Sequence, residues 1–302
     1  METYVIHVTK QCNLDCTYCY EDDKQSVYPW KEVHTLLENI VAHNKDPKFV
    51  IEFLGGEPML AFDHIKKAVK FLDPTGRVAR YVITTNGTIV SDDVIAFLQQ
   101  HTNVTFAISM DGTRTMNQLR VFKETRKNSY DVVAANIKTL LASQLQPKQV
   151  QVHMVTHPYN VASLYRGIQH LYRLGIRHIG IGTIEKTMEL TDEYCHRFIA
   201  EMELVSLGIK SQVFPGLYVD ILEWLKPKSD KRTYLRDPLT NQVVAETYGR
   251  TTEADVTSAG IYTSHVGVSK LGDTIFHLRH TVYRNHRSTH FTNTERSDQK
   301  GG

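Results

Sequence analysis

The chain has 302 residues, of which 41% are hydrophobic and 23% charged, a balance typical of a globular protein with one large domain or one domain plus an appendage. Its 35 basic and 33 acidic residues give a net charge of +2, which excludes a general electrostatic attraction to nucleic acid or membrane. No apolar run reaches the roughly 18 residues of a transmembrane helix, and the N-terminus lacks the pattern of a secretory signal.

Strands and helices alternate through the first part of the chain. Apolar runs predict strands at 4–8, 49–54, 80–84, 104–109, 150–155 and 177–182, and helical spacing of apolar residues predicts helices at 30–43, 62–72, 91 onward, 130–143 and 161–174. Alternation of this kind is typical of a parallel sheet with crossover helices. Because it stops after six units, we predict an α/β fold with a partial, open (β/α)6 TIM-like barrel as the core, residues 1–185.

The pattern changes after residue 185. Residues 190–208 and 216–225 have helical spacing, residues 226–257 are polar, and residues 261–268 and 273–277 have the pattern of a small hairpin. We predict a C-terminal α+β extension at 186–285 that caps the barrel or binds substrate, followed by a flexible tail at 286–302.

Three of the four cysteines, Cys12, Cys16 and Cys19, follow the first predicted strand. Three thiolates at this spacing can hold an iron–sulfur cube and leave one iron without a protein ligand. The alternative is a zinc site completed by His7 or His34.

The next three strands also end in polar or glycine-rich turns. These turns are Gly55-Gly56-Glu57-Pro58, Thr85-Asn86-Gly87-Thr88 and Ser109-Met110-Asp111-Gly112. Each alone could be ordinary turn chemistry. Because the carboxyl ends of parallel strands share one edge, we expect all of them to line a single site beside the cysteines.

With these motifs together, the sequence resembles the radical S-adenosylmethionine (SAM) superfamily. The cysteine spacing matches that family's CxxxCxxC signature, and Gly55-Gly56-Glu57-Pro58 matches its GGEP motif. The resemblance covers about residues 3 to 185. The run from Cys12 to Tyr20, with Ile-Ser-Met-Asp-Gly later, looks most like the peptide- and protein-modifying SPASM/twitch branch.

The resemblance implies a role for each matching residue. Cys12, Cys16 and Cys19 would hold one [4Fe-4S] cluster, Glu57 and the glycine turn would hold the methionyl amine of SAM, and Tyr18 would lie near the adenine. The remaining SAM-pocket positions would be Gly55, Gly56, Pro58, Thr84, Asn86, Ser109, Asp111 and Arg120.

The chemistry that the resemblance implies is reductive cleavage of SAM to a 5′-deoxyadenosyl radical, which takes hydrogen from a substrate. We expect a peptide or protein residue as substrate, with a nucleoside, nucleotide or other small metabolite as the alternative. A structural metal-binding scaffold is the non-enzymatic alternative. Expected partners are SAM and an electron donor of the flavodoxin or ferredoxin type, in the cytoplasm, without membrane or nucleic acid.

The chain departs from that branch at its C-terminal extension, where Ser258 and His277 stand at positions expected for cysteines. We therefore predict no auxiliary cluster. Cys195, the one cysteine outside the triplet, is a candidate hydrogen donor, the alternative being a buried small hydrophobic residue. Glu52, His153, Glu185 and Tyr218 could face the barrel interior. The histidines and arginines of 277–290 are either a docking patch or a solvated tail.

Overall fold

The computed structural model describes residues 2–21, 24–184, 188, 190–225, 232–236 and 243–248. Seven strands form one sheet in which every neighbouring pair is parallel and the spatial order follows the chain. The strands are β1 (Thr3–Thr9), β2 (Phe49–Gly55), β3 (Val78–Thr85), β4 (Val104–Ser109), β5 (Val150–Thr156), β6 (His178–Thr183) and β7 (Tyr218–Val219).

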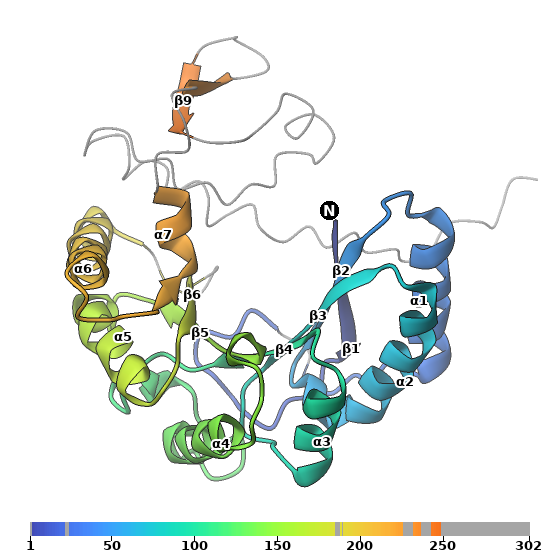
Figure 1. The fold of residues 1–302 in the computed structure, drawn as a ribbon. Helices are drawn as coiled ribbons and strands as arrows, with labels where there is room; N and C mark the ends of the chain where they lie inside the picture. Colours follow the sequence, from blue (N-terminus) through green and yellow to red (C-terminus); the bar gives the residue numbers. More distant parts are fainter. Residues whose placement is uncertain are drawn as a thin grey trace, which may run out of the picture.

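Helices fill the connections and lie around the outside of the curved sheet (Figure 1). They are α1 (Trp30–His43), α2 (Phe62–Leu72), α3 (Asp92–Gln100), α4 (Tyr130–Ala142), α5 (Leu164–Arg173), α6 (Asp192–Lys210) and α7 (Asp220–Leu225), with short 3-10 turns η1 to η5 between elements. Among the described residues β1 and β7 are the two edges of the sheet and are not paired with each other. The predicted α/β fold with a partial barrel is confirmed.

Local signals in the sequence set several helix starts. Ser91 accepts a hydrogen bond from the Val94 amide at 3.4 Å and so caps α3, and Thr191 caps α6 by accepting from the Tyr194 amide at 3.2 Å. Such caps satisfy amides that have no partner inside the helix. The predicted bounds of α1 and α2 agree with the structure to the residue.

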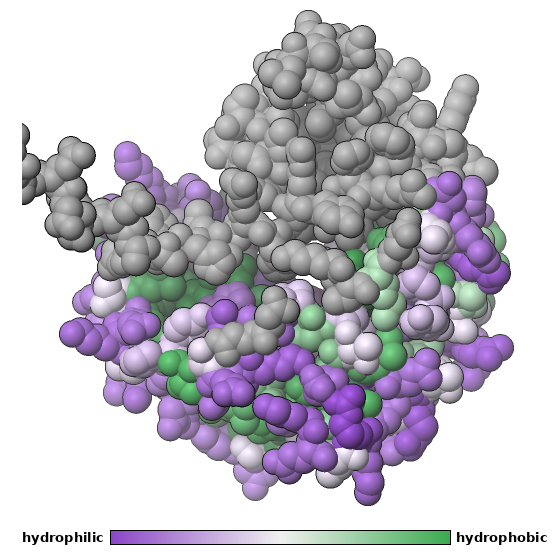
Figure 2. Space-filling view, turned by 180° about the vertical axis from the view of Figure 1, so that it is seen from behind, coloured by the Kyte–Doolittle hydropathy of each residue, from purple (hydrophilic) through white to green (hydrophobic). Residues whose placement is uncertain are grey.

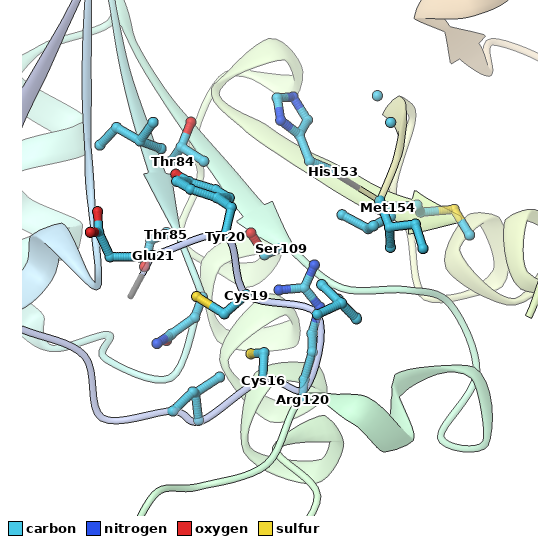
Figure 3. A pocket seen from close by; sticks show the side chains of 18 of the residues that line it. Cys16, Cys19, Tyr20, Glu21, Thr84, Thr85, Ser109, Arg120, His153 and Met154 are labelled. Atoms are coloured by element: carbon cyan, nitrogen blue, oxygen red, sulfur yellow. The ribbon is translucent and has the colours of Figure 1, made fainter. Parts of the chain in front are cut away.

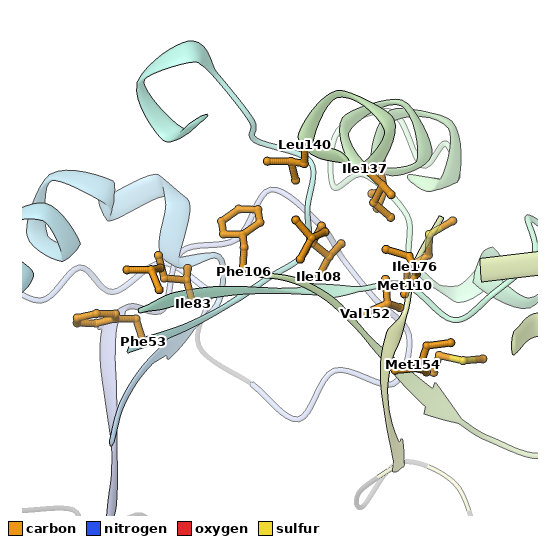
Figure 4. Close-up of a cluster of buried hydrophobic side chains, with 14 of the residues drawn as sticks. Phe53, Ile83, Phe106, Ile108, Met110, Ile137, Leu140, Val152, Met154 and Ile176 are labelled. Atoms are coloured by element: carbon orange, nitrogen blue, oxygen red, sulfur yellow. The ribbon is translucent and has the colours of Figure 1, made fainter. Parts of the chain in front are cut away.

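The main hydrophobic core lies between the outer face of the sheet and the surrounding helices. Figure 4 shows Phe106 and Ile108 of β4 beneath Ile137 and Leu140 of α4. All four side chains are at most 1% exposed. Because side chains alternate along a strand, the other face of each strand points into the barrel.

The barrel interior is less apolar than this core. A small cluster of Val50, Val82 and Ala107 occupies part of it. Two residues further along these strands, on the same face, the side chains are polar, with Glu52 on β2, Thr84 on β3 and others. The barrel interior is therefore apolar around Val50, Val82 and Ala107 and polar nearer the carboxyl ends of the strands.

The segment predicted as a helix over 216–225 divides into β7 and α7. Tyr218 and Val219 extend the sheet by pairing with β6, and the Tyr218 amide donates to Arg177 O at 2.8 Å. The exposed edge of β6 offers main-chain groups that need partners, and this pairing outweighs local helical preference. The helix begins only at Asp220.

The polar stretch 226–257, in which the sequence predicted no particular element, contains two strands in its described part. Strands β8 (Arg232–Arg236) and β9 (Val243–Tyr248) form an antiparallel pair there. Their Thr, Tyr, Leu and Val residues favour strands, but Pro238 and the surrounding charges concealed that preference in the sequence. The predicted hairpin at 261–277, the positions Ser258 and His277, and the predicted tail at 286–302 lie outside the described residues.

Seen from behind, the described surface is mostly hydrophilic with scattered hydrophobic spots (Figure 2). None of the helices in the described ranges is both long and apolar enough to cross a membrane.

Candidate active site

The loop that carries the three cysteines follows β1 and is held by a second segment of the chain. The Asp15 amide donates to Val121 O at 2.8 Å and the Thr17 amide donates to Leu119 O at 3.1 Å. The Asp15 carboxylate also forms an ion pair with Arg126. These bonds hold the cysteine loop against the segment that follows β4.

The three cysteines line one cavity. Burial raises the pKa of the Cys12 thiol, and it raises the pKa of Cys16 to about 12. The charge of Cys19 adds to the increase at both thiols, and that of Cys12 adds to it at Cys16. Thiolates form at such a place when a positive centre such as iron compensates their charge.

Gly55 and Gly56 press against the main chain that leads into the cysteine loop. Gly55 has φ +147°, and a Cβ atom on it would lie 1.9 Å from Thr9 O. A Cβ atom on Gly56 would lie 2.2 Å from Lys10 O and 2.4 Å from Gln11 O. Only glycine allows this approach, so the glycine turn fixes the path of the chain toward Cys12.

Glu57 joins neighbouring turns through its side chain. Its carboxylate is fully buried and accepts hydrogen bonds from the Met59 amide at 2.9 Å, the Thr85 hydroxyl at 2.6 Å and the Asn86 amide at 2.6 Å. Burial raises the pKa of this carboxyl to about 7. Both oxygens are thus used to join two turns, and neither Glu57 nor the buried Pro58 is part of the cavity lining.

The turn after β3 is tied to the cysteine loop by asparagine side chains. Asn86 Nδ2 donates to Asn13 Oδ1 at 2.8 Å and lies 3.8 Å from Cys12 Sγ. Asn13 Nδ2 in turn donates to the Thr88 hydroxyl at 2.8 Å. No role was predicted for Asn13 from the sequence, although its place directly after Cys12 was a usable signal.

A buried ion pair between Arg120 and Asp111 contacts Tyr18 of the cysteine loop. Arg120 binds Asp111 in bidentate fashion, Nε to Oδ2 at 3.0 Å and Nη2 to Oδ1 at 3.0 Å. The Tyr18 hydroxyl donates to Asp111 Oδ2, and the Arg120 guanidinium lies over the Tyr18 ring at 5.2 Å. Arg120 and Tyr18 line the cavity, whereas Asp111 lies behind them and is fully buried.

These groups enclose a cavity of about 420 Å³, a size typical of small-molecule sites. Figure 3 shows Cys16 and Cys19 beside Arg120, with His153 reaching in from another strand. The sequence-predicted residues that line the cavity are Cys12, Cys16, Tyr18, Cys19, Gly55, Gly56, Thr84, Asn86, Ser109 and Arg120. Those that do not are Glu57, Pro58, Asp111 and Cys195.

Cys195, the candidate hydrogen donor, lies in α6 and is fully buried within the main hydrophobic core. The structure therefore does not bring it to the cavity. Glu52 and His153 belong to inward-facing rows, as expected, while Tyr218 is 42% exposed and its ring lies 5.7 Å from that of His178. Glu185 lies outside the described residues.

For several residues that line the cavity, the sequence predicted no role. Glu21 follows the cysteine loop, and Gly180, Gly182 and Asp220 come from β6 and the start of α7. Asp220 could not be found because its segment was predicted to be helical throughout. The two glycines carried a weak signal, since glycine within a strand often marks a close approach.

The model of the radical SAM superfamily matches residues 6–171, more than half of the chain. The chain belongs to the radical SAM superfamily. An uncharacterized protein of Methanocaldococcus jannaschii, MJ0907, is 26% identical to this radical SAM chain over 188 residues, which is 61% of this chain and 63% of the relative.

Two further relatives carry enzyme names. A cysteine-type anaerobic sulfatase-maturating enzyme of Clostridium novyi is 31% identical over 146 residues, covering 44% of this chain and 38% of that protein. A GTP 3′,8-cyclase of Chlorobaculum tepidum is 28% identical over 142 residues, covering 46% of this chain and 40% of that protein. The chain thus spans less than two thirds of the length of these relatives.

A solved structure confirms the fold. The structure of native anSMEcpe with bound AdoMet and Cp18Cys peptide has a TM-score of 0.64 to this radical SAM chain, at 14% identity, over 74% of this chain and 65% of that one. AdoMet is SAM. At this level of identity the likeness concerns the fold.

Members of the superfamily use a [4Fe-4S] cluster and SAM, and the residues of this chain fit both. Three thiols on one cavity wall can bind three irons and leave the fourth free for a chelating ligand. The zinc alternative would need a fourth ligand such as His7 or His34 beside the three thiols. The His34 ring instead packs on Phe71 at 4.7 Å.

Proposed function

We propose that the chain is a radical SAM enzyme that binds one [4Fe-4S] cluster through Cys12, Cys16 and Cys19 and acts on a residue of a peptide or protein. The observation that carries the proposal is the convergence of the three thiols, the Gly55-Gly56 turn and the ends of β3 and β4 on one cavity. When bound, the cluster and SAM supply a 5′-deoxyadenosyl radical, after one-electron reduction of SAM, that takes a hydrogen atom from substrate.

The chain's own residues orient these groups and limit access of water. The glycine turn exposes main-chain groups next to the cysteines, which suits the amine and carboxylate of SAM. Asn86 and Ser109 add directional hydrogen-bonding groups on the same wall. Arg120 is neutralised by Asp111, so it contributes a rigid cationic surface more than a free charge.

A peptide substrate is supported by the sulfatase-maturating relative and by the peptide bound in the solved structure. A nucleotide substrate is the second candidate, supported by the GTP 3′,8-cyclase relative. We propose a flavodoxin- or ferredoxin-type protein as electron donor and the cytoplasm as the place of action, because such a cluster needs a reducing environment.

Anaerobic reconstitution with iron and sulfide, followed by SAM and dithionite, tests the proposal. We expect 5′-deoxyadenosine and about four irons per chain, as for a single cube. About eight irons would contradict the absence of an auxiliary cluster. Bound zinc without SAM cleavage would overturn the enzyme proposal, and stimulation of 5′-deoxyadenosine formation by GTP but not by peptides would favour the nucleotide alternative.

A further inference from the structure

Two polar side chains that the SAM-binding proposal does not use face each other across Gly180. His153 stands on β5, Gly180 is its register partner on β6, and Asp220 begins α7. A Cβ atom on Gly180 would lie 3.0 Å from His153 Nε2 and 3.2 Å from Asp220 Oδ2. All three residues line the cavity. The glycine therefore leaves room for an imidazole and a carboxylate to approach the same point.

The Asp220 carboxylate is held firmly at one oxygen only. Oδ1 accepts from the Ile181 amide at 3.0 Å and from the Ile221 amide at 2.6 Å. Within the described part of the chain, Oδ2 has no hydrogen-bond donor. Burial raises the pKa of this carboxyl, which shows that its charge is costly until a donor or cation pairs with it.

His153 is likewise available to a ligand. Its ring nitrogens have no hydrogen-bond partner among the described residues, and burial lowers its pKa, so the neutral imidazole can accept a hydrogen bond. The charged groups that act on it are Asp220, Glu52 and Arg80. Of these, Arg80 is exposed and Glu52 accepts from the Thr84 hydroxyl at 2.7 Å.

Arg120, the other basic side chain of the described cavity wall besides His153, is already bound by Asp111. Lys10 lies outside this lining, 3.2 Å from Glu21, which does line the cavity. Among the described residues this leaves Asp220 as a half-buried carboxylate with no lysine or arginine at ion-pair distance, on the side of the cavity formed by β5 and β6. A ligand group that is both positively charged and rich in N–H donors would complement it.

We propose that His153 and Asp220 form a substrate-recognition pair that takes an ammonium or guanidinium group, as on a lysine or arginine side chain. This inference rests on the proposed function and deepens it by naming the substrate class. The cation donates to Asp220 Oδ2 and to the neutral imidazole, which holds the adjoining carbon chain in the cavity that the cysteine loop also lines. Gly180 is a positioning residue for the pair.

The test uses the reconstituted full chain with SAM, dithionite and capped tripeptides Ac-Gly-X-Gly-NH₂. X is perdeuterated lysine, arginine or norleucine, the last being an uncharged match for lysine in length. Hydrogen-atom transfer breaks a C–D bond of the peptide, forms a C–D bond at C5′ of 5′-deoxyadenosine and leaves the radical on the peptide. We expect deuterated 5′-deoxyadenosine from lysine or arginine peptides and about tenfold less from norleucine.

Single-residue variants test whether deuterium transfer depends on Asp220 and Gly180. Asp220→Asn keeps the oxygen that accepts from the two amides and alters only the unpaired position, so we expect about a tenfold loss of deuterium transfer. Gly180→Ala should cause a similar loss. Gly182→Ala adds the same methyl group to another lining position on the same face of β6, where the nearest atom is Met154 O at 4.0 Å, so its loss of transfer should be clearly smaller than that of Gly180→Ala.

Formation of 5′-deoxyadenosine without peptide is the second measurement, taken across SAM concentrations. It should be unchanged in Asp220→Asn. A higher SAM requirement in that variant would overturn the proposal by making the pair part of the SAM site. Equal transfer from norleucine and lysine, or no transfer from any peptide while 5′-deoxyadenosine forms, would also overturn it. No 5′-deoxyadenosine at all would mean that the proposed function itself fails, and this inference with it.

Discussion

Asp111 is a buried residue that connects several parts of the cavity wall from behind. Its carboxylate binds Arg120, accepts from the Tyr18 hydroxyl and accepts from the Val155 amide at 3.0 Å. Its own amide donates to Asn117 Oδ1 at 3.1 Å. One side chain therefore joins the cysteine loop, the end of β4 and the end of β5. We infer that its function is to position Tyr18 and Arg120 on the cavity wall.

Asp111→Asn is expected to destabilise the protein strongly. The substitution removes the charge that compensates a buried guanidinium, and breaking a buried pair of this kind costs about 3–5 kcal/mol. Urea denaturation of the oxygen-free protein measures the loss. Asp15→Asn is the matched control, because Asp15 binds Lys24 and Arg126 at an exposed position and such pairs contribute up to about 1 kcal/mol. Equal losses in the two variants would contradict the role given to Asp111.

At the scale of elements, the cysteine loop is shaped by the turns beside it. The turn after β2 presses two glycines against residues 9–11, and the segment after β4 pairs with residues 13–17. The loop lies between these two supports. The geometry of the cysteine loop therefore depends on the connections after β1, β2 and β4 together. A change in any one of them should shift the cysteines that bind the cluster.

Gly56→Ala tests this dependence. The new Cβ atom would meet Lys10 O and Gln11 O, both main-chain atoms, so the chain before Cys12 must move. Loss of support around metal ligands lowers metal affinity on the order of tenfold or more, and iron retained per chain during chelator challenge measures it. Gly76→Ala is the control: it has φ +62° and no atom within 4 Å of the new Cβ, so it should lose about 1 kcal/mol of stability and keep its iron.

The sequence predicted those parts of the site that follow strand ends. Thr84, Asn86 and Ser109 lie on the cavity wall because the carboxyl ends of parallel strands meet at one edge, a rule that needs no coordinates. Glu57 does not line the cavity, and a motif could not predict this because it gives residue order but not side-chain direction. Asp220 was missed because a two-residue strand leaves almost no periodic signal, and its pairing depends on the free edge of β6.

At the scale of the whole molecule, helix α6 packs as part of the barrel, which bears on where the barrel domain ends. The sequence placed the boundary at residue 185, where the strand–helix alternation stops. In the structure, however, Tyr194, Phe198, Met202 and Val205 of α6 are buried in the main core. The Tyr194 hydroxyl lies 2.6 Å from the Thr156 hydroxyl, and Asp220 accepts from the Ile181 amide. We propose that the barrel unit extends through Leu225.

Two truncated chains distinguish these boundaries. Burial of each large apolar side chain contributes about 1.5–3 kcal/mol, so loss of the four α6 side chains removes an amount comparable with the total stability of a typical domain, about 5–15 kcal/mol. We therefore expect a chain of residues 1–185 to lack a cooperative thermal transition, and one of residues 1–225 to unfold cooperatively and to bind iron on reconstitution. Circular dichroism during heating, with iron per chain as the second measurement, provides the comparison. A cooperative, iron-binding 1–185 chain would restore the earlier boundary and reduce α6 to an accessory helix.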